Sequence, residues 1–162
     1  MIQNFFKKKS VSSKEMNLTK VTEEDKKERE FMKIMSSMTP LENEPNLLKS
    51  DITAKRFLKS RDYVIKNAEL LLKNDLEWRQ MKKPLQVECK MCLDKPGAHS
   101  MRQIGFDLIQ RPVIYSSFTQ ASVAKVDPSN VIDHMIFILE NCVKTMIPGV
   151  NQWVLIFDCS GE

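Results

Sequence analysis

One stretch of this chain has the spacing of a metal or redox site. Cys89 and Cys92 are separated by two residues in CKMC, a spacing typical of zinc ligands and of redox pairs, and His99 follows shortly after. A structural zinc ion takes four ligands, and this stretch provides only three. A redox pair would stand at the start of a helix after a strand, and no such pattern precedes Cys89. We therefore expect incidental thiols, no metal site and no cofactor.

The second histidine, His134, lies beside Asp133 in an apolar stretch with helical spacing. No motif places a nucleophile near it, so an acid or base role has little support. The chain also lacks a glycine-rich phosphate loop, a nucleophile elbow and a paired-carboxylate motif. These absences predict a protein that is not an enzyme.

The composition is that of one globular domain with a small appendage. The chain has 162 residues, of which 42% are hydrophobic and 28% are charged. Its 25 basic and 21 acidic residues give a net charge of +4, too mild to predict a nucleic-acid partner. The sequence shows neither a signal peptide nor an apolar run long enough to span a bilayer. We therefore expect a cytoplasmic protein.

The N-terminal half of the chain reads as a leader followed by helices. Residues 1–20 are polar and lysine-rich without a period, which predicts a flexible basic leader that is more often a solvated tail than a membrane contact. Residues 21–84 predict a helical region. Thr22 can cap a first helix and Asp51 a second, and Pro84 ends a third, longer one.

The remaining residues, 85–162, begin with a connector over 85–104 and continue as strand, helix and strand. The strands are RPVIYSSF and QWVLIF, and Asp127 with Pro128 opens the helix between them. The apolar face of that helix is predicted to consist of Ile132, Met135, Ile136, Leu139, Val143 and Met146. Such a crossover unit joins parallel strands, and the continuous apolar run WVLIF is typical of a strand covered on both faces.

Three stretches follow one another in the chain: KRFLKSRDYVIKNAELLLKNDLEWR, GFDLIQRPVIYSSF and WVLIFDCSG. In this order they resemble the motifs of the CRAL-TRIO lipid-binding family, which includes phosphatidylinositol and phosphatidylcholine transfer proteins. The first is similar to the family's N-terminal helical motif, which ends in a Trp-Arg pair. The second is similar to its Asp-x-x-Gly-Arg-Pro-Val strand, and the third to the next strand with its end at Asp158 and Gly161. The likeness covers residues 51–162.

The resemblance implies a domain that encloses one lipid-like molecule in a hydrophobic cavity, which apolar burial favours. It also implies that Arg61 contacts a headgroup phosphate, a role suited to a guanidinium. On the first strand, Tyr115 and Ser117 alternate with Ser116 and Phe118, so one pair can line the cavity while the other faces a covering helix. We name Tyr115 and Ser117 as the candidate lipid contacts, although the alternation by itself leaves both pairs open.

Two positions depart from the family pattern. Gln110 stands where the family normally has glycine, and Val64 where it often has an aspartate cap, so we expect a slack junction between the two helices. The family's fold also continues past the Asp-x-x-Gly end. Residues 85–162 are therefore expected to be a partial CRAL-TRIO domain in a C-terminally truncated chain, with an open apolar surface on the last strand.

Together these observations predict an α/β protein with a helical N-terminal region and a partial CRAL-TRIO sheet. We expect it to bind a phospholipid or another hydrophobic ligand and to move or present it between membranes, which it would touch transiently. The alternative is a lipid-independent protein-interaction or regulatory module on the same fold, because half a pocket does not shield an acyl chain.

Overall fold

The computed structural model describes residues 21–123 and 127–160. The predicted basic leader over residues 1–20 and the last residue of the third motif, Gly161, lie outside the described residues. In chain order the elements are α1 (Glu23–Ser36), η1 (Leu47–Lys49), α2 (Asp51–Lys59), α3 (Ile65–Lys82), η2 (Pro84–Gln86), α4 (Lys90–Asp94), β1 (Arg102–Phe106), β2 (Pro112–Ser117), α5 (Phe118–Val123), α6 (Pro128–Lys144) and β3 (Val154–Asp158).

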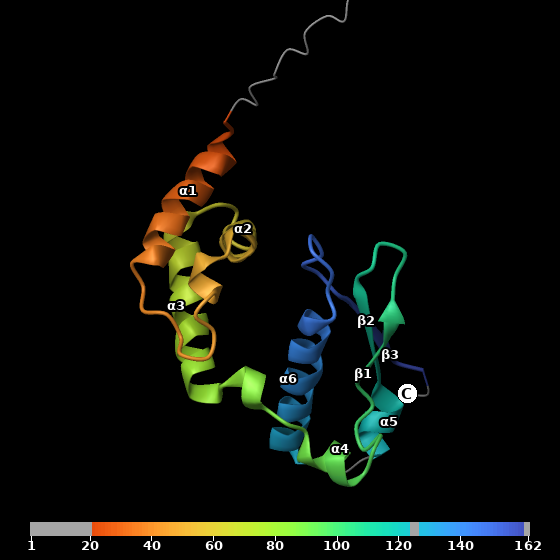
Figure 1. The fold of residues 1–162 in the computed structure, drawn as a ribbon. Helices are drawn as coiled ribbons and strands as arrows, with labels where there is room; N and C mark the ends of the chain where they lie inside the picture. The colour runs from red at the N-terminus through yellow and green to blue at the C-terminus, as the bar shows by residue number, and fades with distance from the viewer. Residues whose placement is uncertain (1–20, 124–126, 161–162) are drawn as a thin grey trace, which may run out of the picture.

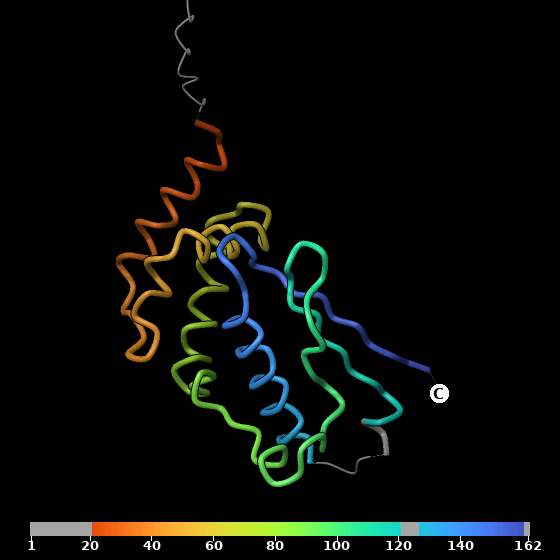
Figure 2. Tube along the Cα trace, turned by 45° about the vertical axis from the view of Figure 1, so that its right-hand side comes forward, coloured from red at the N-terminus to blue at the C-terminus, as the bar shows by residue number. Residues whose placement is uncertain are grey.

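The N-terminal helices gather around a core of their own. Its buried residues are Phe31, Met35, Leu48, Ala54, Phe57, Leu58, Ala68 and Leu72. In Figure 1 this group of α1, α2 and α3 lies on one side and the three-stranded sheet on the other, with α6 between them. Figure 2 shows the same order from a second direction. The predicted α/β fold class with a helical N-terminal region is confirmed.

Local signals fix where the first two helices begin. Thr22 and Asp25 form a reciprocal capping box on α1, with backbone-to-side-chain hydrogen bonds of 2.8 and 3.1 Å. The predicted cap of α2 is wrong by one residue. Ser50, not Asp51, accepts the hydrogen bond from the Thr53 amide, and Asp51 is the first helical residue. Both residue types cap well, so the pattern could not separate two neighbours.

The junction between α2 and α3 lacks a side-chain cap, as the departure at Val64 predicts. Val64 occupies the N-cap position of α3 without a side-chain hydrogen bond. The two residues before it, Asp62 and Tyr63, have φ values of 51° and 57°. These left-handed conformations are unfavourable for residues with a side chain, so the turn holds some backbone strain.

The sheet has the strand order β1-β2-β3, with β1 antiparallel and β3 parallel to the central β2. The parallel pair confirms the predicted crossover, which consists of α5 and α6. Strand β1 was missed in the connector over 85–104. Its pairing shifts between Gln103 and Gly105, and Gly105 has a φ of 148°. A bulge of this kind breaks the alternation by which a strand is recognised.

The turn between β1 and β2 is closed by the motif's own residues. The Asp107 carboxylate accepts hydrogen bonds from the backbone amides of Ile109 and Arg111 and forms an ion pair with the Arg111 guanidinium at 2.7 Å. Gln110, which stands in place of the family's glycine, has a φ of 65°. The family's preference for glycine is explained here, because glycine adopts this conformation without a steric penalty.

Helix α6 turns only part of the predicted apolar face to the sheet, because Leu139 packs there but three of the other residues do not. Its buried residues are His134 and Cys142, with Ile138 and Leu139 packed against Met101 and Ile114. Of the predicted apolar face, Ile132, Met135 and Val143 are exposed. His134, Ile138 and Cys142 are four residues apart and therefore share one side of the helix. A search for apolar residues alone overlooks this side, because it contains a histidine.

The last strand has the open apolar surface that was expected for it in a partial domain. Leu155, Ile156 and Phe157 keep 42, 43 and 52% of their surface exposed. The prediction that both faces of this strand are covered is therefore wrong for the described residues. Within the described sheet β3 is an edge strand, whereas a central parallel strand would be covered on both faces.

Candidate functional site

The two faces of the sheet differ in what covers them. On β2, Ile114 is buried against α6. Because side chains alternate along a strand, Tyr115 and Ser117 point to the opposite side. The parallel register sets Tyr115 beside Ile156 and Ser117 beside Asp158. We call this side the outer sheet face; it is formed by Val113, Tyr115, Ser117, Val154, Ile156 and Asp158.

The other candidate pair on β2 lies elsewhere. Ser116 is on the side of α6, where its hydroxyl is 3.1 Å from that of Ser100. Phe118 is no longer in the strand, because it opens α5 and lies with its ring 5.9 Å from that of Phe157. The strand predicted over RPVIYSSF is thus one residue too long at its end.

The outer sheet face changes from apolar to polar along both strands. Val113 and Val154 lie at its beginning, and Ser117 and Asp158 pair at its end. The Tyr115 hydroxyl donates a 2.6 Å hydrogen bond to Asp158 Oδ2, and the Arg102 guanidinium lies 5.3 Å from the centre of the Tyr115 ring. The face therefore offers an apolar half and a hydrogen-bonded polar half.

Hydrogen bonds determine the charge of that polar half. Those from the hydroxyl of Ser160, from Tyr115 and from the Ser160 amide hold the pKa of Asp158 at about 2, so the carboxylate is charged at neutral pH. The same bond to Asp158 raises the pKa of Tyr115, which stays a neutral donor.

The third predicted lipid contact, Arg61, lies in the helical region instead. It follows α2, where its guanidinium donates to the Ser60 carbonyl at 2.7 Å. It lines a shallow hollow of about 210 Å³ together with Asn67, Leu70, Leu71 and Asn74 of α3. None of the lining residues of this hollow comes from the described sheet, so Arg61 is not brought together with Tyr115 and Ser117 there.

A larger groove of about 570 Å³ lies between the loop after α1 and the end of α3. Its lining is largely polar and charged, and it includes Glu44, Glu77, Arg79 and Lys83. Arg79 belongs to the Trp-Arg pair of the first motif. Such a lining offers little apolar surface, in contrast to the apolar half of the outer sheet face.

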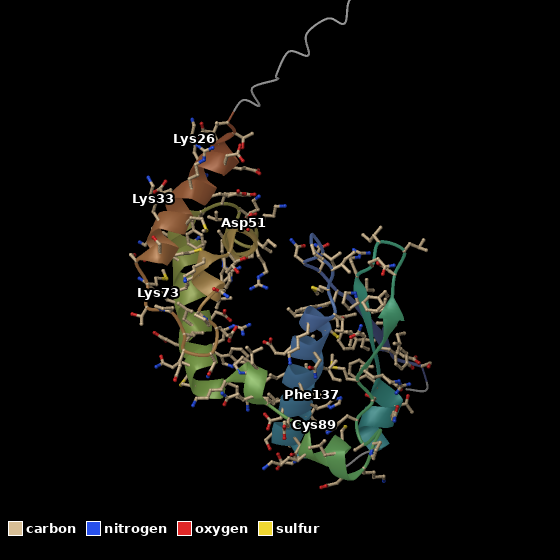
Figure 3. The ribbon with its side chains drawn as sticks, in the orientation of Figure 1. Lys26, Lys33, Asp51, Lys73, Cys89 and Phe137 are labelled. Carbon is tan, nitrogen blue, oxygen red and sulfur yellow. The ribbon has the colours of Figure 1, made fainter. Side chains whose placement is uncertain are left out.

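Arg79 joins the helical region to the sheet region. Its guanidinium forms ion pairs with Glu44 at 2.9 Å, with Asp75 at 3.2 Å and with Glu140 of α6 at 3.3 Å. A second pair, Lys82 with Asp133 of α6, measures 2.5 Å. Figure 3 shows the contrast with Lys33 and Lys73, which lie on the outer side of the helices, away from α6.

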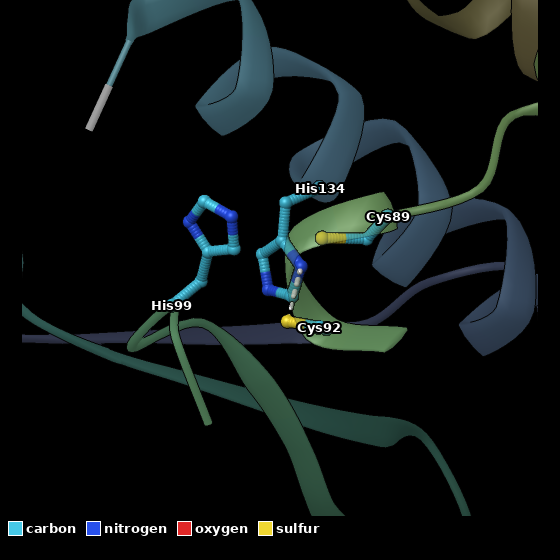
Figure 4. A group of neighbouring side chains, drawn as sticks. All are labelled: Cys89, Cys92, His99 and His134. Carbon is cyan, nitrogen blue, oxygen red and sulfur yellow. Dashed lines mark hydrogen bonds between the residues drawn. The ribbon is translucent and has the colours of Figure 1, made fainter. Parts of the chain in front are cut away.

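Two cysteines and both histidines, for which no role was predicted from the sequence, come together in one cluster. Cys89, Cys92, His99 and His134 each offer a ligand atom, and these four atoms all lie within 4.8 Å of one another. Figure 4 shows the four side chains converging from α4, from the loop before β1 and from α6. The prediction that a fourth ligand is lacking is therefore wrong, because α6 supplies His134 from a distant part of the chain.

The comparison with protein-family models concerns the sheet region. Residues 100–161 match the model of the CRAL/TRIO domain. This CRAL/TRIO segment contains the whole described sheet and α6, so Tyr115, Ser117 and His134 lie inside it, while Arg61 and Cys89 lie outside. No curated protein matches the chain.

CRAL/TRIO domains are in general lipid-binding and not enzymatic, which agrees with the coarse prediction from the motifs. Among the helices that the structure describes, none is both long enough and apolar enough to cross a membrane.

Proposed function

We propose that this protein binds a phospholipid-like ligand on the outer sheet face and moves or presents it between membranes. The observation that carries the proposal is the division of this face, within the CRAL/TRIO segment, into an apolar and a polar half. The apolar half suits an acyl chain, whose burial is worth about 0.8 kcal/mol per CH2. The polar half offers hydroxyl, carboxylate and guanidinium groups to a headgroup.

Tyr115 and Ser117 are the proposed lipid contacts on this face. Arg61 is proposed to bind a headgroup phosphate, as in phosphatidylinositol, when the protein meets a membrane. The support for Arg61 is its exposed position beside Asn67 and Asn74, whose amide groups can also donate hydrogen bonds to phosphate oxygens. We further propose a cytoplasmic protein that touches membranes peripherally and carries out no catalysis.

Two neighbouring residues of β3 provide a matched test. Leu155 and Ile156 are almost equally exposed, at 42 and 43%, but only Ile156 lies on the outer sheet face. We expect Ile156→Glu to lower the extraction of phosphatidylcholine and phosphatidylinositol from vesicles about tenfold, because a tenfold loss needs only about 1.4 kcal/mol. Leu155→Glu should stay within about twofold of the unchanged chain, a difference of under about 0.5 kcal/mol.

Equal losses in both variants, or none in Ile156→Glu, would contradict the proposed site. A folded chain that extracts no lipid but captures a protein partner regardless of added lipid would favour the interaction-module alternative.

For Arg61, the change to Ala should weaken binding of phosphatidylinositol vesicles more than that of phosphatidylcholine vesicles. Lys59→Ala, at the neighbouring helix end, serves as its control.

A further inference from the structure

The cluster of Cys89, Cys92, His99 and His134 has features that the lipid-binding function does not use. The chain contains only two histidines, and both lie in it together with two of the four cysteines. Cys89, His99 and His134 keep 4, 9 and 4% of their surface, and Cys92 is half-buried. Burying a polar side chain costs free energy unless the side chain has a partner. Four such side chains in one place therefore indicate a shared partner.

His99 lacks such a partner. Its Nε2 is buried and has no hydrogen-bond partner among the described residues. The His99 ring instead stacks on the ring of His134, with 4.3 Å between the ring centres. A buried nitrogen that is left unpaired destabilises the folded chain. A metal ion in the plane of the His99 ring, bound at Nε2, would satisfy it.

His134 is already held in the form that a metal ligand requires. Its Nε2 lies 2.7 Å from the carbonyl oxygen of Met101, which can only accept, so Nε2 carries the proton. Nδ1 then keeps its lone pair, which accepts from the Cys92 thiol with 3.6 Å between Nδ1 and Sγ. A backbone carbonyl that fixes the tautomer of a ligating histidine in this way is common in metal sites.

The two cysteines are presented together by local structure. Cys89 is the N-cap of α4, and its carbonyl accepts the amides of Cys92 and Leu93 at 3.0 and 3.1 Å. Residues three apart on such a turn share one side, so both sulfurs face His134. Helix α4 buries no residue of its own, so apolar packing does little to hold this part of the connector.

We propose that Cys89, Cys92, His99 and His134 bind one structural zinc ion. Two thiolates and two neutral imidazoles form a tetrahedral set that suits zinc, and two thiolates neutralise its charge, as a buried site requires. Zinc–ligand bonds of about 2.0–2.3 Å place the ligand atoms of a tetrahedral site about 3.3–3.8 Å apart. The four ligand atoms here lie within 4.8 Å of one another, so the longest of these distances would shorten by about 1 Å on zinc binding.

The proposed zinc ion would fasten the connector to the crossover helix. The four protein ligands leave no position for water or substrate, which makes the site structural and not catalytic. Its ligands come from α4, the loop before β1 and α6, so binding would hold the start of the CRAL/TRIO sheet against α6. Because an ion of this kind binds the folded chain preferentially, it would also stabilise the fold.

Metal content and cobalt substitution test the proposal. The chain purified under reducing conditions should contain one zinc ion per molecule, measured by mass spectrometry of the element. After removal of zinc with a chelator, Co²⁺ should give the intense visible bands of a tetrahedral ion and a thiolate-to-cobalt charge-transfer band. Added Zn²⁺ should raise the melting temperature of the metal-free chain.

Single substitutions distinguish a specific zinc site from adventitious metal binding by thiols. Cys92→Ser and His99→Gln should each weaken Zn²⁺ binding at least about 100-fold, since even the outer partners of such ligands are worth 10–100-fold. Cys159→Ser, which changes an exposed cysteine outside the cluster, should leave zinc affinity and the cobalt spectrum unchanged. Six-coordinate cobalt, less than half an equivalent of zinc, or equal losses in Cys92→Ser and Cys159→Ser would overturn the proposal.

Discussion

At the scale of single residues, hydrogen bonds decide the state of the polar groups. Asp158 is charged because Ser160 and Tyr115 donate to it, and His134 carries its proton on Nε2 because Met101 offers a carbonyl. Neither state follows from residue type, since an aspartate or a histidine takes its character from the donors and acceptors around it. The position of Asp158 in the third motif is visible in the sequence, but its partner Tyr115 is found only in the sheet.

The hydrogen bonds to Asp158 should make the free energy of unfolding depend on pH in the acid range. Its folded pKa of about 2 is below the ordinary value of 3.8, so it stabilises the folded state above about pH 3.8, and this contribution is lost as the pH falls through about 2. Asp158→Asn should therefore be less stable than the unchanged chain at neutral pH, and the difference should shrink over that window. Urea unfolding at a series of pH values measures it.

Tyr115→Phe is the companion variant, because it removes one donor and leaves the carboxylate. It should show a smaller loss than Asp158→Asn over the same pH window. If the difference between Asp158→Asn and the unchanged chain stayed constant down to about pH 2, the assignment of these bonds would be wrong.

At the scale of elements, caps and turns explain where helices and strands stop. The capping box at Thr22 and the cap and proline at Asp127 and Pro128 act within one turn, and both were predicted correctly. Strand β1 was missed because its bulge at Gly105 breaks the alternation. The predicted face of α6 was right only in part, with Leu139 packed against the core, because what the helix buries depends on Met101 and Ile114, which lie outside it.

A cap at Val64 should stabilise α3. Val64 has an extended conformation at the N-cap position, and its side chain makes no capping hydrogen bond. Val64→Asp can accept from the first amides of the helix, so we expect a gain of about 1 kcal/mol in the free energy of unfolding. Val64→Ala is the control for lost side-chain contacts. A Val64→Asp variant no more stable than Val64→Ala would show that the strained turn before it prevents capping.

At the scale of the whole molecule, charged side chains connect the helical region to the CRAL/TRIO sheet. Arg79 reaches Glu44, 35 residues away in sequence, and Glu140, 61 residues away. Lys82 reaches Asp133 on the same helix α6. Helix α6 is therefore the element through which the helical region, the sheet and the cysteine–histidine cluster all meet.

Removing the charge of Arg79 should weaken this connection. Its side chain is only 14% exposed, and its loss would leave three neighbouring carboxylates without a partner. We expect Arg79→Met to cost about 2 kcal/mol of unfolding free energy, less than a fully buried pair because the site is partly solvated. Lys73→Met, which breaks an exposed pair with Glu69, should cost under about 0.5 kcal/mol. If chemical denaturation gave similar losses of unfolding free energy for Arg79→Met and Lys73→Met, the ion pairs of Arg79 would not stabilise the contact between the two regions.

The parts of this protein that could be predicted from its sequence depend on neighbours a few residues apart. Helix caps, the parallel crossover and the three CRAL-TRIO motifs follow from short patterns, because their hydrogen bonds and faces repeat within a turn or a strand. Two relations became visible only in the folded chain: the side of β2 on which Tyr115 lies, and the contact of His134 with Cys92. These relations join segments separated by dozens of residues, and the packing of α6 against the sheet brings them together.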